Sequence, residues 1–165
     1  MFGLLKVRRA RKVAVALISP FVEESQTRFS SQLTEHAWLD PYMVGFMSML
    51  ISLAAEYTAG RLDSESAGLV QLEAWQEVTG FPSHLIGEEI CLLSSGQDRK
   101  FRHGCLNASR FMEELTRPVH SHPDQLPPGY RTHGLNYDRS AAMALWSELF
   151  DGHIGALDGD PGLPR

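Results

Sequence analysis

The chain contains 165 residues, of which 43% are hydrophobic and 21% charged, and only two are cysteines. This composition excludes a generally disordered chain, a collagen-like repeat and a disulfide-stabilised scaffold, so we expect one soluble globular domain. The net charge of −5 is unevenly distributed, because residues 1–22 contain five basic and no acidic residues, whereas residues 23–165 contain ten basic and twenty acidic ones.

The first predicted element is a basic amphipathic helix at residues 1–18. Ser19 and Pro20 predict a break after it, because proline lacks the amide donor that a continuing helix uses. A second helix, with few apolar residues, is predicted on the surface near residues 21–34. The apolar residues of the first helix share one arc of a helical wheel, which only Arg11 interrupts: Leu4, Val7, Ala10, Ala14, Leu17 and Ile18.

A central apolar helix is predicted at about residues 41–58. Asp40 is a typical N-cap residue, and Pro41 is favoured at the first helical position. No charged residue occurs from Pro41 to Ala55, and apolar side chains occupy every side of the helical wheel. Such a helix either spans a membrane or forms the centre of a bundle. Fifteen uncharged residues are fewer than the roughly 20 that a span requires, so we expect the centre of a bundle.

Four further helices are predicted from apolar periodicity and capping residues, near residues 64–79, 83–94, 98–115 and 138–149. Residues 116–137 contain four prolines and three histidines, and we expect them to form a long loop. Glycine and proline recur in residues 152–165, which predicts a flexible tail.

The predicted fold class is all-α, because no segment alternates with the period of a strand. We expect a single irregular bundle of six to seven helices around the central helix. The predicted organisation is a basic helix at residues 1–18, a bundle domain at residues 19–151 and a tail at residues 152–165.

The loop at residues 116–137 contains the strongest enzyme-like feature. His120, His122 and His133, with Asp124 nearby, offer three imidazoles and a carboxylate, which suit zinc or iron. No helix or strand is predicted to hold the first two imidazoles, although metal ligands need support from neighbouring groups. We therefore expect no cofactor, and a divalent metal held by this loop is the alternative.

Other catalytic and nucleic-acid-binding patterns are absent from the sequence. There is no Gly-x-Ser-x-Gly motif, no phosphate-binding glycine loop, and no Asp or Glu followed three residues later by His. Residues 80–82 join two helices as in a helix-turn-helix, but the second carries two glutamates and no fixed positive charge. We therefore expect no nucleic-acid partner. Cys105 lies in an apolar seam, where a thiol is predicted to be inert.

The basic residues of the first helix are the predicted partner-binding residues. Because the rest of the chain is acidic, we expect this helix to dock on the body of its own chain or of a second copy. Peripheral binding of residues 2–18 to an anionic membrane is the alternative. The five cations are Lys6, Arg8, Arg9, Arg11 and Lys12.

These observations predict a small non-catalytic interaction protein, an adaptor or regulator, that self-associates or engages an acidic protein surface. The first alternative is a metal-binding protein or enzyme with its site in residues 116–137, and a weaker one is an apolar-ligand carrier lined by methionines of the central helix. Two unpatterned cysteines and the lack of a small-x-small cleavage motif after the apolar run at residues 13–18 predict a cytoplasmic location. The inner face of a membrane is the alternative location.

Overall fold

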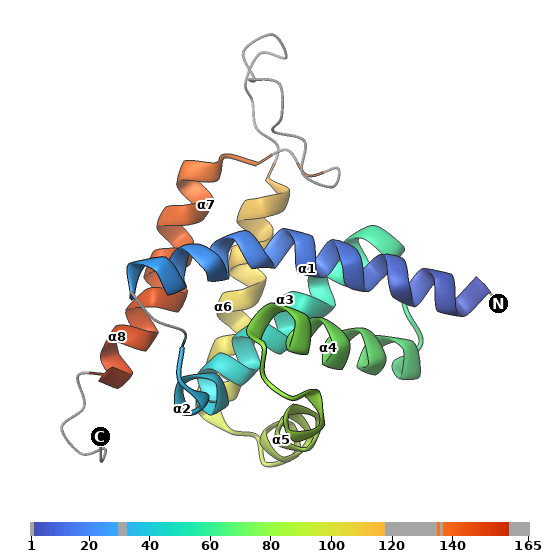
Figure 1. The fold of residues 1–165 in the computed structure, drawn as a ribbon, viewed down its shortest axis with the longest axis horizontal. Helices are drawn as coiled ribbons and strands as arrows, with labels where there is room; N and C mark the ends of the chain where they lie inside the picture. The colour runs from blue at the N-terminus through green and yellow to red at the C-terminus, as the bar shows by residue number, and fades with distance from the viewer. Residues whose placement is uncertain (1, 30–32, 118–134, 136, 159–165) are drawn as a thin grey trace, which may run out of the picture.

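The computed structural model describes residues 2–29, 33–117, 135 and 137–158. Every regular element in these ranges is helical (Figure 1), which confirms the all-α bundle. Of the loop expected at residues 116–137, the described ranges include only the two ends. The elements are α1 (Phe2–Arg28), α2 (Glu35–Leu39), α3 (Pro41–Ala59), α4 (Ser64–Thr79), α5 (Ser83–Ser95), α6 (Arg99–Thr116), α7 (Arg139–Trp146), the π-helix η2 (Ser147–Asp151) and α8 (Gly152–Asp158).

Helix α3 is the centre of the bundle, as its sequence predicts. Met43, Phe46, Met47 and Leu50 have no exposed surface, because α6, α1 and α4 pack around α3 (Figure 1). The Asp40 carboxylate accepts a hydrogen bond from the Tyr42 amide, which confirms the predicted cap. Within the described residues no single helix is long and apolar enough to cross a membrane, although the α3–α4 pair, bent by 120°, meets the length and composition criteria together.

Helices α3 and α6 cross with their backbones in contact. A Cβ atom on Gly104 would lie 2.1 Å from the carbonyl oxygen of Tyr42, and one on Gly45 would lie 2.1 Å from the carbonyl oxygen of Phe101. Each glycine therefore leaves room for the backbone of the other helix. This approach buries one side of α6 against the centre of the bundle, including Phe101, Ala108, Phe111, Met112 and Leu115.

Helix α1 continues past the break that Pro20 predicts. It ends at Arg28 and includes most of the separate surface helix expected at residues 21–34, so this boundary was wrong. The reason is tertiary packing, because Phe21 and Val22 extend the buried face of α1 into the core. Pro20 itself is exposed, on the side of the helix where water can satisfy the carbonyl that lacks an amide donor.

The C-terminal part of the chain contains more helix than its composition predicts. The flexible tail expected at residues 152–165 begins instead as α8, in which Ile154 is buried, and residues 159–165 lie outside the described ranges. Before α8, the π turn of η2 buries three consecutive residues, Leu149, Phe150 and Asp151.

Asp151 joins the end of the described chain to α1. Its carboxylate accepts hydrogen bonds from the Ser25 hydroxyl and, at 2.6 Å, from Arg28 Nη1. Trp146 Nε1 donates to Ser25 Oγ at 2.8 Å. These three hydrogen bonds join residues that are 121 to 126 positions apart in the sequence. They give the polar side chains the partners that buried polar groups require.

Candidate functional site

Two of the five predicted partner-binding cations are engaged by the protein's own fold. Arg11 is half-buried, and its Nη1 lies 2.7 Å from Glu73 Oε2 on α4. Its Nε lies 3.6 Å from Glu77 Oε2, too far for a hydrogen bond but close enough for charge attraction. Lys6 Nζ donates to the carbonyl oxygen of Arg61 at 2.8 Å. The cation that interrupts the apolar arc of α1 therefore binds α4 of the same chain.

The apolar arc of α1 is part of the core. It packs on α3 and α4, so α1 is continuous with the bundle and does not form a separate layer (Figure 1). Burial of these residues fixes the rotation of α1 about its axis, and with it the residues that face solvent. The buried members of the arc are Val7, Ala10, Ala14, Leu17 and Ile18.

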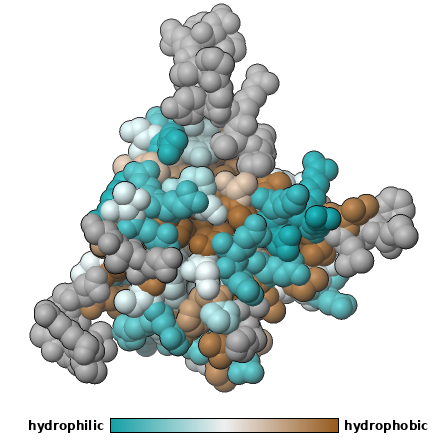
Figure 2. All heavy atoms as spheres, in the orientation of Figure 1, coloured by the Kyte–Doolittle hydropathy of each residue, from teal (hydrophilic) through white to brown (hydrophobic). Residues whose placement is uncertain are grey.

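The outer side of α1 presents what we call the cationic face, formed by Leu5, Arg8, Arg9, Lys12 and Val13. These residues recur at helical spacing and line a shallow hollow of about 610 Å³. Leu5 is 65% exposed, and the three cations are exposed. None of the three cations has an ion-pair partner within the described residues, whereas Arg11 has two. Figure 2 shows hydrophilic side chains gathered over the N-terminal half of α1, next to hydrophobic ones.

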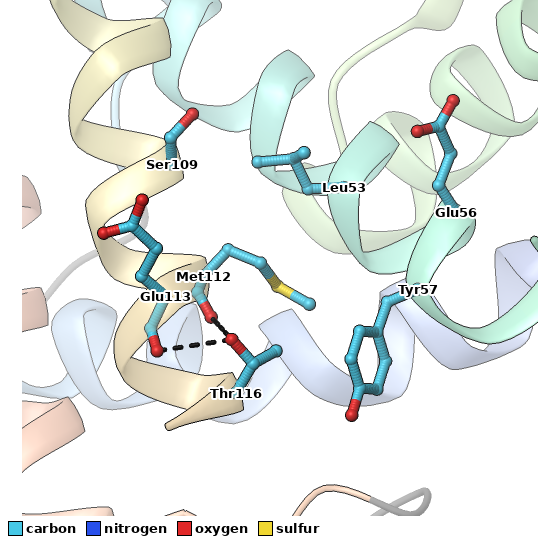
Figure 3. Close-up of a pocket in the computed structure, with 7 residues that line it drawn as sticks. All are labelled: Leu53, Glu56, Tyr57, Ser109, Met112, Glu113 and Thr116. Carbon is cyan, nitrogen blue, oxygen red and sulfur yellow. Dashed lines mark hydrogen bonds between the residues drawn. The ribbon is translucent and has the colours of Figure 1, made fainter. Parts of the chain in front are cut away.

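A second surface feature lies between the C-terminal halves of α3 and α6, which we call the α3–α6 groove (Figure 3). Its volume is about 450 Å³, and Leu53, Tyr57 and Met112 supply its apolar surface. Met112 extends from α6 toward α3, and Glu56 and Glu113 stand on opposite sides. The Thr116 hydroxyl donates to the backbone of its own helix, and Ser109 completes the lining.

Sequence reasoning missed this groove because its residues belong to two helices with other roles. Met112 has the spacing of the core-facing seam of α6, and Tyr57 and Glu56 follow the uncharged stretch of the central helix. Only the exposure of Tyr57, which is 53%, distinguishes it from a core aromatic residue. That exposure depends on how α3 and α6 cross, which no local pattern encodes.

A polar cluster at the other end of α3 contains the Asp–His arrangement most reminiscent of acid–base catalysis. His153 Nε2 lies 2.8 Å from Asp40 Oδ1, and its ring stacks on Tyr42 with centroids 4.0 Å apart. The Tyr42 hydroxyl donates to the carbonyl oxygen of Leu149 at 2.8 Å and accepts from Asn107 Nδ2 at 2.9 Å. These polar atoms all have partners within the protein, so the cluster connects α3 to α6, η2 and α8.

The pKa values in this cluster agree with a structural role. Burial of Asp40 opposes ionisation, but the hydrogen bond and charge of His153, the hydrogen bond from the Tyr42 amide and the charge of Lys100 together outweigh it and hold the pKa of Asp40 below its usual 3.8. Burial raises the pKa of the Tyr42 phenol above its usual 10.0, so the hydroxyl stays a donor at neutral pH. Sequence reasoning missed His153 because it placed this residue in the flexible tail.

The predicted metal ligands His120, His122 and His133 lie outside the described residues. Among the residues that are described, no group of three His, Cys, Asp or Glu side chains could hold a metal ion. Cys105 is half-buried, its Sγ lies 3.5 Å from the carbonyl oxygen of Gly45, and burial raises the pKa of its thiol. A raised pKa disfavours the nucleophilic thiolate, as expected for an inert cysteine.

Comparison with known proteins finds no family model, no curated protein and no solved structure that matches this chain.

Proposed function

We propose that the protein is a small non-catalytic interaction protein, an adaptor or regulator, that engages an acidic protein surface through the cationic face of α1. The observation that carries this proposal is a difference in ion pairing between the cations of α1. Arg11 is neutralised by Glu73, while Arg8, Arg9 and Lys12 surround an exposed leucine and have no ion-pair partner within the described residues. A cluster of unneutralised charge beside an apolar side chain suits a complementary protein surface.

The buried arc of α1 favours a protein partner over a membrane. An amphipathic helix binds an interface by inserting its apolar side, and in this protein that side packs on α3 and α4. Leu5 and Val13 are the apolar residues of the cationic face. Binding of this face to an anionic membrane would therefore be stabilised by charge attraction but would bury little apolar surface. The proposal includes a cytoplasmic location, which suits the free thiols of Cys91 and Cys105.

Site-specific photo-crosslinking in cells tests the proposal. A photoreactive residue replaces Leu5 on the cationic face or, as the control, Leu106 on α6; both side chains are 65% exposed. We expect protein adducts from position 5 that exceed those from position 106, and we expect Arg8→Glu, Arg9→Glu and Lys12→Glu together to remove them.

Equal adducts from the two positions, or adducts that survive charge reversal, would contradict the proposal. A matched charge-reversal control uses three exposed cations on other helices, Arg99, Arg102 and Arg139, each changed to Glu. This control introduces the same change in net charge and should leave the adducts from position 5 intact. Flotation of the wild-type chain on anionic vesicles, lost on face reversal, would instead favour the membrane alternative.

A further inference from the structure

We propose that the acidic surface bound by the cationic face is the α3–α6 groove of a second copy of this chain. This inference rests on the proposed function and identifies the partner and the place of contact. The cationic face supplies Leu5 and the three cations, and the groove supplies an apolar floor with a glutamate on each side.

The charges of the two surfaces are complementary. Glu56 and Glu113 have no side-chain ion pair within the described residues, and the same holds for Arg8, Arg9 and Lys12. The one other glutamate on these two helices, Glu114, is paired within the chain, with Arg117 at 2.9 Å. The groove therefore carries negative charge that the protein itself leaves uncompensated, and opposite charges of this kind guide association.

The apolar parts of the two surfaces are complementary as well. Leu5 is 65% exposed, and the groove is a hollow of about 450 Å³ with Leu53 and Met112 at its floor (Figure 3). Tyr57 exposes 53% of its surface at the side of the groove. An exposed aromatic ring favours stacking of a guanidinium group, and methionine adapts its shape to an inserted side chain. The groove suits a leucine flanked by arginines.

The cationic face cannot reach the groove of its own chain. Arg11 and the buried arc hold the inner side of α1 on α4 and α3, so the outer side points away from the body to which the groove belongs. The occupant is therefore a second molecule. Because the two contacting surfaces differ, two copies can dock reciprocally as a two-fold symmetric dimer, or successive copies can dock head to tail as a ring or chain.

Sedimentation velocity of the full chain tests this inference with two charge-reversed variants. The face variant combines Arg8→Glu, Arg9→Glu and Lys12→Glu, and the groove variant combines Glu56→Lys and Glu113→Lys. We expect the wild type to self-associate in a salt-sensitive manner. Each variant alone should associate about tenfold or more weakly, because attraction becomes repulsion.

Mixing the variants gives the decisive result. The face variant retains a normal groove and the groove variant retains a normal face, so an equimolar mixture should form a one-to-one complex. A chain that carries both sets of changes should self-associate again, since its charges are exchanged and not removed. Matched controls, Arg99→Glu with Arg102→Glu and Arg139→Glu, and Glu88→Lys with Glu89→Lys, should associate like the wild type.

A wild-type chain that stays monomeric at millimolar concentration, or a groove variant that associates like the wild type, overturns the inference. The photo-crosslinks from position 5 separate this failure from failure of the proposed function. Adducts to the α3–α6 groove support both, and adducts only to another protein overturn the self-contact while leaving the interaction function in place. No adducts above those of position 106 overturn both.

Discussion

The Gly104→Ala substitution tests the backbone contact between α3 and α6. The added Cβ would lie 2.1 Å from the Tyr42 carbonyl oxygen and 2.7 Å from the Phe46 amide nitrogen, both backbone atoms that cannot rotate away. Ordinary contact begins near 3.4 Å, so the helices must separate by about 1.3 Å at the crossing. Overpacking of this kind costs about 3 kcal/mol, against a gain of about 1 kcal/mol in helix propensity. We expect a net loss of about 2 kcal/mol or more.

Urea denaturation followed by circular dichroism measures this loss, and Gly68→Ala is its control. Gly68 also lies within a helix, but a Cβ added there meets no atom within 4 Å. That variant should be more stable than the wild type by up to about 1 kcal/mol. In thermal unfolding, Gly104→Ala should lower the Tm by about 4–8 °C. A Gly104→Ala protein as stable as the wild type, beside a normal Gly68→Ala result, would refute the close crossing.

Two further predictions concern α1 and the polar cluster. Pro20→Ala should restore the amide donor to the Ala16 carbonyl and raise the free energy of unfolding by about 1–3 kcal/mol, measured in urea; a decrease would show that α1 does not continue through Pro20. For Asp40 the pKa is lower in the folded state than its usual 3.8, so its stabilisation is complete above that pH and declines as the pH falls below it. Asp40→Asn should therefore be less stable than the wild type at neutral pH, and the difference should shrink as the pH falls below 3.8. A difference that is constant with pH would contradict the role assigned to the ionised carboxylate.

Local sequence features predicted the elements that depend on local interactions. The side chains of Asp40, Asp63, Asp98 and Asp138 all accept hydrogen bonds from amides of the helices that follow them, as their positions indicate. The uncharged stretch after Pro41 likewise predicted the buried centre of the bundle, because a helix that is apolar on every side and too short to span a membrane needs other helices around it.

Features that depend on distant residues could not be predicted in this way. Pro20 is a strong local stop, and it was overridden by burial of Phe21 against helices that follow much later in the chain. Arg11 interrupts an apolar arc, and the reason is Glu73, 62 residues away. His153 follows a glycine in a polar segment, and only the packing of α8 brings it to Asp40. The α3–α6 groove likewise results from a helix crossing.

The hydrogen bonds of Ser25 and Arg28 to Asp151 cannot form until Asp151 has been synthesised, so this part of the fold is completed late. A ribosome adds about 5–20 residues each second, so the 123 positions between Arg28 and Asp151 take about 6–25 s to make. Throughout that time Phe21 and Ser25 lack Trp146 of α7, whose ring lies 5.3 Å from that of Phe21 and donates a hydrogen bond to Ser25. A chain truncated before Trp146 would leave this side of Phe21 without its partner, and exposed apolar surface of this kind is what chaperones and proteases recognise in unfinished copies.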